Sequence, residues 1–489
     1  MTLRAMWRHW VRPVDPQTRD DLRAAWARLD PAFRVPQQTI GQLEEGCGAT
    51  VGAMPTCDFG CKGCYLGGNA NATPPLPVSA IKAQMRQLRE RLGAWGNLQL
   101  TDGEVTLRDE DELIELLRYA RQIELVPMLM THGETFRRRP GLLERLMRDG
   151  GLVELSIHVD MLQRGREKDY AKARSEAALM PLRAEFAQMI RAARRTTGLP
   201  LRVASTCTVT PDNLGEVPAL VRWFRDHAEA FRIIAFQPAA QVGRSRPGLG
   251  GHVTQQDVWE QAAAGMLGDA APMQERAAWT DRQWWFGHPD CSRMMAGVVC
   301  TQPETEPRYQ PLGPQVDETQ ARLFARFARR WGGISFRHGG RAVVAAQLAG
   351  MVRQDPGFFV TLAPRTAWQV IKRLNPQRPG RLARQLLTRR ARLHPFIIST
   401  HAFMSHEELE TPLGQERVRN CIFTVPIDGE LVSMCEVNAL GIRDRLYDRA
   451  AGRDPAPDES LVGLTVSAGV EQADGVCVAG GELPRNAGV

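Results

Sequence analysis

Short apolar runs alternate with segments of helical periodicity between residues 46 and 250. From Ser79 to Leu92, apolar side chains recur every three or four positions, at Ile81, Met85, Leu88 and Leu92, which places them on one face of a helix. The runs between such segments are short, apolar and bounded by turn residues, as buried strands are. This alternation is typical of a parallel sheet or barrel whose successive strands are joined by helices.

Six strand–helix units are predicted on this basis. The strands are expected at 48–68 (a strand followed by a cysteine-bearing loop), 97–101, 126–131, 152–158, 201–209 and 231–236. The helices are expected at 79–92, 110–122, 141–147, 176–196 and 214–227. Because functional groups collect at the carboxyl ends of parallel strands, the residues that follow these strands are where a site is expected.

The flanking segments are predicted to form separate units. Residues 1–45 are expected to be a helical lead-in, 251–395 a mostly helical linker or cap, 396–450 a cysteine-bearing β-hairpin unit and 451–489 a poorly ordered tail. The segment 346–395 is strongly basic, with leucines interleaved. It fits an anionic membrane surface, a charged substrate or simply a solvated helix face.

Composition narrows the class of protein. The 489 residues and the 43% hydrophobic fraction provide for more than one core, and a net charge of +7 permits an anionic partner without requiring one. No nucleic-acid partner is expected.

Ten cysteines are too sparse for a disulfide scaffold, and the first residues show no signal peptide. No run of about eighteen apolar residues predicts a membrane span. A reducing, cytoplasmic location is therefore expected, with peripheral membrane contact as one alternative for the basic segment.

The strongest chemical signal is the stretch from Cys57 to Tyr65, in which Cys57, Cys61 and Cys64 have the spacing C-x3-C-x2-C. Thiolates are soft ligands, and cysteine sets of this kind hold iron–sulfur clusters. Three ligands leave one iron of a four-iron cluster open to a substrate. The alternatives are a structural zinc site, which usually has paired C-x2-C knuckles, or three unrelated thiols.

This motif, with the aromatic Tyr65 after the third cysteine, resembles the signature of the radical S-adenosylmethionine (radical SAM) superfamily. The resemblance implies an α/β fold with a partial (β/α)6 barrel at 46–250 and an α+β C-terminal extension. It also implies a [4Fe–4S] cluster on the three cysteines, with S-adenosylmethionine (SAM) chelating the fourth iron. An electron donor such as a flavodoxin or ferredoxin is implied as a partner. The expected chemistry is reductive cleavage of SAM to a 5′-deoxyadenosyl radical that removes a hydrogen atom from a substrate.

The resemblance extends to the end of the second predicted strand, where the family carries a Gly-Gly-Glu-like motif that binds the SAM amino group. Here it is Asp102-Gly103-Glu104, which differs at the first position. Gly103 permits close backbone approach, and Glu104 offers a carboxylate to an ammonium group. Without the cysteine loop, the same residues would be interpreted as a solvent-facing turn with two acids.

Four other residues are assigned to the site. Tyr65 is expected on the adenine side of SAM, and Asp160 is expected to hold ribose hydroxyls. His158 either faces the substrate or is a satisfied histidine at a strand end. Arg244 is expected to meet the SAM carboxylate or an anionic substrate, with a surface arginine as the alternative.

A second cysteine pair lies at Cys421 and Cys435, on either side of Asp428-Gly429. A two-residue hairpin turn would pair Ile427 with Glu430, whereas a three-residue turn would pair Cys421 with Cys435 and bring the thiols face to face. The three-residue turn is the expectation. The pair would then hold a second iron–sulfur cluster, with Cys291 and less firmly Cys300 as further ligands. A disulfide and two buried thiols without a role are the alternatives.

The substrate is the least defined feature. The segment from Cys421 to Asn438, which includes Met434-Cys435-Glu436-Val437-Asn438, resembles the C-terminal part of the radical SAM branch that contains tetraether-lipid synthases and related methylases. That resemblance implies C–C bond formation or methylation on a lipid-like substrate. Modification of a peptide or a small metabolite is the alternative, and a non-catalytic iron–sulfur electron-transfer or scaffold protein is the alternative from another class.

Overall fold

The structure is a computed structural model that describes residues 7–8, 10–167, 170–245, 251–268, 271–303, 305–336 and 341–453. Most of the predicted C-terminal tail, residues 454–489, lies outside the described residues. Among the described helices, none combines the length and the apolar character that crossing a bilayer requires.

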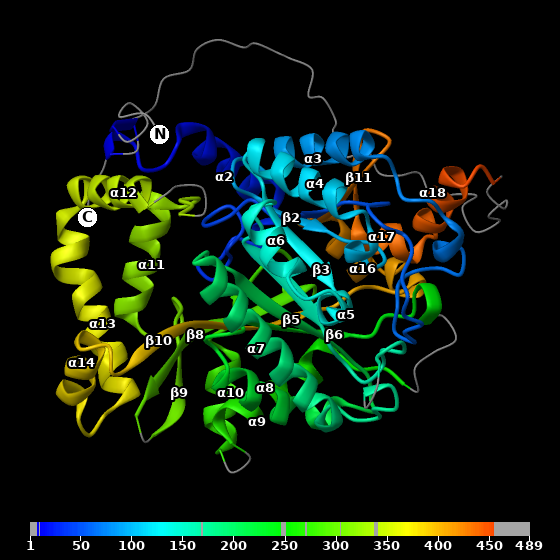
Figure 1. Ribbon diagram of the computed structural model, residues 1–489. Helices are drawn as coiled ribbons and strands as arrows, with labels where there is room; N and C mark the ends of the chain where they lie inside the picture. Colours follow the sequence, from blue (N-terminus) through cyan, green and yellow to red (C-terminus); the bar gives the residue numbers. More distant parts are fainter. Residues whose placement is uncertain are drawn as a thin grey trace, which may run out of the picture.

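One mixed sheet organises the described part of the chain (Figure 1). Its strands run in the order β12-β11-β1-β2-β3-β4-β5-β6-β10-β8-β7, and β9 pairs with β8. The bounds are β1 Cys47–Ala49, β2 Asn97–Leu100, β3 Val126–Thr131, β4 Glu154–His158, β5 Arg202–Val209, β6 Ile233–Pro238, β7 Trp284–Trp285, β8 Ser292–Gln302, β9 Thr305–Pro311, β10 Arg392–His401, β11 Phe423–Ile427 and β12 Glu430–Ser433. Strands β1 to β6 are neighbours in chain order and are all parallel, which confirms the predicted partial barrel.

Helices cover the outer face of the parallel strands (Figure 1). These are α3 Val78–Leu92, α4 Glu110–Gln122, α5 Glu134–Arg138, α6 Leu142–Arg148, α7 Met180–Thr197, α8 Val217–Asp226 and α9 Gln255–Leu267. In α3, the predicted face of Ile81, Met85, Leu88 and Leu92 is at most 1% exposed, and it joins one core that extends from α3 to α9. The helical period predicted these contacts because only one face of each helix meets the sheet.

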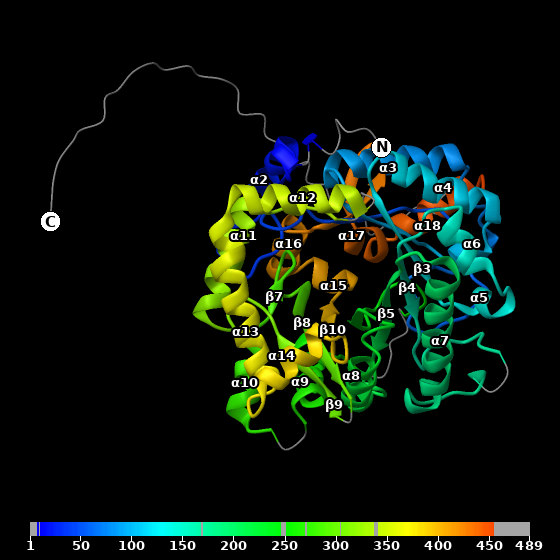
Figure 2. The ribbon, with the colours of Figure 1, turned by 60° about the vertical axis from the view of Figure 1, so that its left-hand side comes forward.

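The remaining helices lie in the flanking segments. They are α2 Pro16–Arg28, α10 Met273–Thr280, α11 Glu318–Trp331, α12 Arg341–Gln354, α13 Ala363–Leu374, α14 Pro379–Leu387, α15 His406–Leu409, α16 Pro412–Arg419, α17 Met434–Ala439 and α18 Ile442–Ala450. Figures 1 and 2 show α11 to α14 on one side of the molecule and α16 to α18 on the other.

The C-terminal half of the chain completes both edges of the barrel sheet. Strand β10 pairs in parallel with β6, and β11 pairs in parallel with β1. The segment 251–395 is expected to be mostly helical, but it also contributes the strands β7, β8 and β9. Strand β8 pairs antiparallel with both β10 and β9. Partners this distant in sequence leave no local pattern, which is why propensity missed the role of these strands.

The predicted register of the β11–β12 hairpin is wrong. Ile427 pairs with Glu430 across a two-residue turn, so Cys421 is not opposite Cys435. Asp428 and Gly429 have φ angles of 49° and 92°, the two positive values that a two-residue turn of this kind requires. Cys435 lies in α17 rather than in the strand.

Candidate active site

The loop that bears Cys57, Cys61 and Cys64 leaves the sheet after β1 and lies over the carboxyl ends of its neighbours. Gly60 N donates to Arg164 O at 2.7 Å, and Lys62 N donates to Leu162 O at 3.4 Å, in the segment after β4. Phe59 N donates to Cys57 Sγ at 3.4 Å. The three thiols are therefore held in a loop that is fixed at its middle by backbone hydrogen bonds.

All three thiols are partly or largely shielded from solvent. Burial, with a smaller contribution from the neighbouring Cys64, raises the pKa of Cys61 to about 12. Burial also raises the pKa of Cys64, while Arg244 and Arg443 act in the opposite direction. Only the thiolate binds metal, so a bound cation would have to stabilise the charged form of these thiols. Burial raises the pKa of any shielded thiol, so it is the C-x3-C-x2-C spacing within one loop that favours a metal centre over three unrelated side chains.

The Asp102-Gly103-Glu104 turn after β2 lies directly against the start of the cysteine loop. Gly103 N donates to Met54 O at 2.8 Å, and Glu104 N donates to Thr56 O at 2.9 Å. A Cβ at Gly103 would come within 2.3 Å of Pro55 O. Only glycine permits this approach, so Gly103 fixes the distance between the turn and the cysteine loop.

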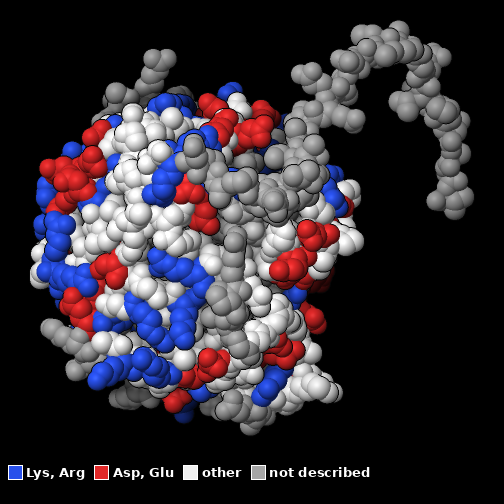
Figure 3. Space-filling view, turned by 90° about the vertical axis from the view of Figure 1, so that its right-hand side faces the viewer, with Lys and Arg blue, Asp and Glu red and all other residues white. Residues whose placement is uncertain are grey.

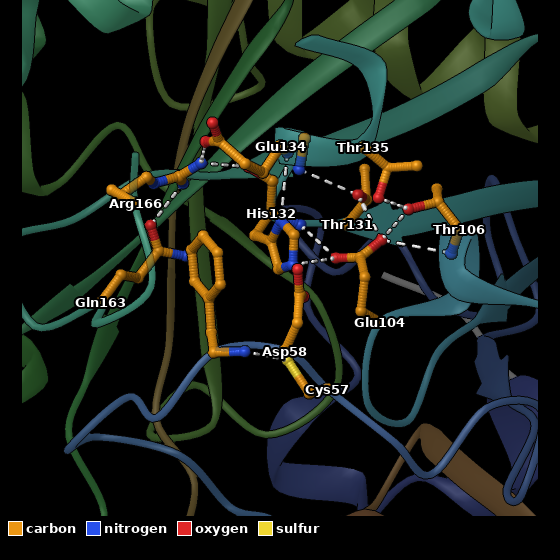
Figure 4. Close-up of polar contacts among 12 residues, drawn as sticks. Cys57, Asp58, Glu104, Thr106, Thr131, His132, Glu134, Thr135, Gln163 and Arg166 are labelled. Carbon is orange, nitrogen blue, oxygen red and sulfur yellow. Dashed lines mark hydrogen bonds and ion pairs between the residues drawn. The ribbon is translucent and has the colours of Figure 1, made fainter. Parts of the chain in front are cut away.

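Glu104 is the centre of a buried hydrogen-bond network (Figure 4). Its Oε1 accepts from Thr106 N and Oγ1, at 3.2 and 2.5 Å, and from Thr131 Oγ1 at 2.6 Å. Its Oε2 accepts from His132 N at 2.8 Å. The side chain is 1% exposed. The carboxylate thus ties the end of β2 to the end of β3, and its oxygens are engaged within the protein.

His132 and Asp58 lie beside Cys57, and a ring nitrogen, a carboxylate oxygen and the sulfur are all within 4.8 Å of one another. His132 Nδ1 accepts from Glu134 N at 3.1 Å, so the proton is on Nε2, which is 2.8 Å from Asp58 Oδ1. Arg138 also donates to Asp58. His132 and Asp58 are therefore hydrogen-bonded to each other beside Cys57.

The family comparison agrees with this geometry. Residues 52–224, the part that contains the cysteine loop and strands β2 to β5, match the model of the radical SAM superfamily. This segment is a radical SAM domain. The match confirms the expected superfamily and, with it, the class of protein as an enzyme.

Solved structures are also similar to the chain, at low levels. SuiB from Streptococcus suis bound to precursor peptide SuiA is 12% identical, with a TM-score of 0.30, over 40% of this chain and 39% of its own. SuiB bound to S-adenosylmethionine is 13% identical, with a TM-score of 0.30, over 42% of each chain. A further SuiB structure is 12% identical, with a TM-score of 0.32, over 48% of this chain and 55% of its own.

These SuiB matches therefore span about half or less of the SuiB chains, and similarity at this level carries no argument about function. A comparison with curated proteins found no match.

Within the radical SAM domain, Asp160 and His158 form a pair at the end of β4. Asp160 Oδ2 is 2.6 Å from His158 Nε2 and accepts from Thr208 N at 3.1 Å, while Oδ1 accepts from Leu162 N at 2.9 Å. Burial acts to raise the pKa of Asp160, but His158 and these hydrogen bonds outweigh it and lower the pKa. Asp160 is 2% exposed, whereas the His158 side chain is 35% exposed. The accessible member of the pair is His158.

Arg244 and Tyr65 also lie at the cysteine loop. Arg244 N donates to Cys64 O at 3.0 Å, and its Nη1 donates to Phe59 O at 3.2 Å, so one residue holds two points of the loop. The Tyr65 hydroxyl donates to Asp102 O at 2.6 Å, and the Arg443 guanidinium lies 4.7 Å from the Tyr65 ring centroid. Both predicted residues are thus placed at the site, and both already support the loop.

Asp102, the departure from the family motif, binds the C-terminal helix. Its φ angle of 123° is strained for a residue with a side chain. Its carboxylate accepts from Gly52 N, Arg443 Nη1 and the Tyr447 hydroxyl, and it is 4% exposed. Arg443 and Tyr447 belong to α18, so this ion pair fastens the C-terminal unit to the turn that supports the cysteine loop.

The sequence did not assign roles to His132, Arg166 or Arg443. Arg166, which is 4% exposed, donates to His132 O at 2.7 Å and to His158 O at 2.8 Å, and it lies 5.0 Å from the Phe59 ring centroid (Figure 4). It joins the ends of β3 and β4 to the cysteine loop. The position of His132 directly after a predicted strand could have indicated a role in the site. Arg166 and Arg443 lie in segments whose sequence gives no such indication.

The second set of cysteines is brought together from three elements. Cys291 precedes β8, Cys421 precedes β11 and Cys435 lies in the first turn of α17. Burial, with a smaller contribution from Cys291, raises the pKa of Cys435 to about 12. Burial also raises the pKa of Cys421, with Cys435 and Cys291 as the next causes. Cys300 is separate, since it is fully buried in an apolar cluster with Val370 and Leu382.

Among the described residues, neither set of three cysteines has all its sulfur atoms within 4.8 Å of one another. A multi-iron cluster separates its thiolates more widely than a single ion does. Arg417 Nε donates to Cys291 Sγ at 3.3 Å, which places a positive charge beside the second set.

Proposed function

We propose that the chain is a radical SAM enzyme in which Cys57, Cys61 and Cys64 hold a [4Fe–4S] cluster whose fourth iron binds SAM. The observation that carries this proposal is the set of three shielded thiols in one loop, held at the carboxyl ends of parallel strands in a segment that matches the superfamily. When bound, the cluster and SAM would supply a 5′-deoxyadenosyl radical that removes a hydrogen atom from the substrate.

The residues of the chain would orient SAM largely through the backbone. Because the Glu104 carboxylate is engaged by Thr106, Thr131 and His132, we assign it to holding the turn in place. The SAM amino group would then meet the turn's main chain, and Asp160 would act through His158 rather than on the ribose directly. Arg244 and Arg443 would stabilise the negative charge that a thiolate-ligated cluster places near Cys64.

The substrate would meet the inner face of the sheet. Outward residues of β2, β3 and β6 are fully buried in the core, whereas the alternate inward residues Gln99, Met130 and Gln237 retain exposed surface. His158, on β4, shares this face. Because these side chains are amides, thioethers and an imidazole, the part of the substrate that reacts would be uncharged. This is compatible with a lipid-like substrate and with a neutral part of a peptide or metabolite.

Anaerobic reconstitution with iron and sulfide, followed by dithionite and SAM, tests the proposal. We expect 5′-deoxyadenosine to form, and we expect none in a sample from which the iron has been removed by chelation. Absence of 5′-deoxyadenosine from a sample whose iron and sulfide match a full cluster would contradict the enzyme proposal. That result would favour a non-catalytic iron–sulfur protein.

We further propose that Cys291, Cys421 and Cys435 hold a second iron–sulfur cluster. A Cys421→Ala variant should bind less iron and sulfide in total, while the first cluster and SAM cleavage persist, because Cys421 belongs to none of the elements that hold the first loop. Iron and sulfide analysis with 5′-deoxyadenosine measurement checks this. A Cys300→Ala variant is the matched control, since that thiol is buried away from both sets. Unchanged iron in Cys421→Ala would contradict the second cluster.

A further inference from the structure

Exposed apolar side chains are concentrated on one helical segment of the chain. We call residues 341–393, which contain α12, α13, α14 and the first two residues of β10, the helical arm. Of the eleven large hydrophobic side chains that are exposed among the described residues, six lie on it. These are Leu348, Val352, Val360, Trp368, Leu387 and Leu393. Single exposed apolar residues are ordinary, but a concentration of them marks a contact surface.

The same arm carries an excess of positive charge. Residues 341–393 contain eleven Lys and Arg residues and one acid, Asp355. Asp355 is 4% exposed and is paired with Arg326, so it does not offset the charge at the surface. Among the described residues, Arg373 pairs with Asp317, whereas Arg365, Arg381 and Arg384 have no recorded ion pair. Figure 3 shows another face of the molecule, on which groups of Asp and Glu are present as well as groups of Lys and Arg.

The outer apolar residues are not needed to hold the arm to the molecule. The inner faces of α13 and α14 already bury Val370, Leu374 and Leu382 against Cys300. Phe358 and Met351 pack with Trp331 in a separate cluster. The arm lies at the edge of the molecule opposite α18 (Figures 1 and 2). Its outer face is therefore available to a partner.

Basic and apolar residues are interleaved on this outer face. On α13, Arg365, Trp368 and Lys372 are exposed and lie three and four residues apart, so they share one face. The Lys372 ammonium is 5.8 Å from the Trp368 ring centroid. On α14, Leu387 is 86% exposed and follows exposed Arg384 by three residues. A tryptophan and leucines set among cations form the composition of helices that lie in a membrane interface.

We propose that the helical arm is a peripheral contact site for an anionic lipid bilayer. The Lys and Arg side chains would lie at the phosphate level, while Trp368 and Leu387 would enter the boundary between headgroups and acyl chains. A nucleic acid or an acidic protein would satisfy the charges but would leave Leu387, Val360 and Leu348 without an apolar environment. The apolar residues thus favour lipid over other polyanions. The proposal is independent of the chemistry at the cysteine loop.

Vesicle co-sedimentation of the full reconstituted chain tests this contact. We expect binding to vesicles with roughly a third phosphatidylglycerol and at least about tenfold weaker binding to pure phosphatidylcholine. Higher salt should weaken the binding, because the attraction is screened.

An Arg381→Glu, Arg384→Glu double variant should weaken vesicle binding by about fivefold or more per residue. A Trp368→Ser, Leu387→Ser double variant should also weaken it several-fold, with the same helical content by circular dichroism.

The matched control is Leu413→Ser, which removes an exposed leucine outside the arm (48% exposed) and should bind vesicles as the unmodified chain does. If the Trp368→Ser, Leu387→Ser variant bound vesicles as tightly as the unmodified chain, lipid insertion would be refuted. Binding to a single-stranded RNA oligonucleotide without binding to anionic vesicles would overturn the proposal in favour of a nucleic-acid surface.

Discussion

A Cys61→Ala variant is expected to lose its iron–sulfur cluster and to form no detectable 5′-deoxyadenosine. Gly60 and Lys62, on either side of Cys61, are fixed by hydrogen bonds to Arg164 O and Leu162 O. The loop therefore cannot shift to bring another thiol into the vacant position. Since loss of an outer-shell partner of a metal ligand already costs 10–100-fold, loss of a ligand should reduce SAM cleavage by more than about 100-fold. Iron and sulfide analysis and chromatographic detection of 5′-deoxyadenosine measure the effect.

Two variants make this experiment selective. Cys300→Ala removes a fully buried thiol from an apolar cluster and should retain both iron and cleavage. Cys421→Ala should retain cleavage with less iron. Cys61→Ala protein that kept SAM cleavage at the level of the unmodified chain would show that the cysteine loop is not the catalytic centre.

An Arg443→Met variant is expected to lower the free energy of unfolding by about 3–5 kcal/mol, the cost of breaking a buried ion pair from one side. Asp102 is 4% exposed and would lose the cation that offsets its burial. Methionine retains much of the arginine's length, so the loss is electrostatic rather than steric. Urea denaturation of the reconstituted protein, followed by circular dichroism, measures the change.

The control for this prediction lies on the same helix. Arg449 pairs with Asp428 at the surface, where both side chains are more than 60% exposed, so Arg449→Met should change stability by less than about 1 kcal/mol. Combining Arg443→Met with Asp102→Asn should restore part of the lost stability, because the unpaired charge is then absent. Equal stabilities of Arg443→Met and Arg449→Met proteins would refute the role of the buried pair.

The local pattern of apolar and polar residues was sufficient to predict those helices and strands whose formation depends on residues close together in the sequence. The helix predicted at 79–92 is α3, Val78–Leu92, and the strand predicted at 126–131 is β3, Val126–Thr131. Within the predicted helical lead-in, α2 begins at Pro16 after Asp15, whose side chain accepts from Gln17 N at 3.0 Å. In each case, the period of the apolar residues or a capping residue carried the information.

Contacts between distant segments could not be predicted in this way. The Asp428-Gly429 sequence is compatible with a two-residue and with a three-residue hairpin turn. The structure has the two-residue turn, and β11 pairs with both β12 and β1. The sequence does not indicate that the Glu104 carboxylate accepts hydrogen bonds from Thr131 and His132 at the end of another strand. Nothing near residue 102 in the sequence indicates that its carboxylate meets Arg443.

By itself, the sequence determined the parallel strand–helix order and the three-cysteine loop, because both depend on residues within a few positions of one another. Only the tertiary structure decided which side chains surround that loop, because Asp102, Arg244 and Arg443 meet there from three separate segments. It also placed Cys300 in an apolar cluster with Val370 and Leu382, apart from the other cysteines. The physical reason is that burial and charge pairing depend on distance in space, which the spacing of residues along a chain does not fix.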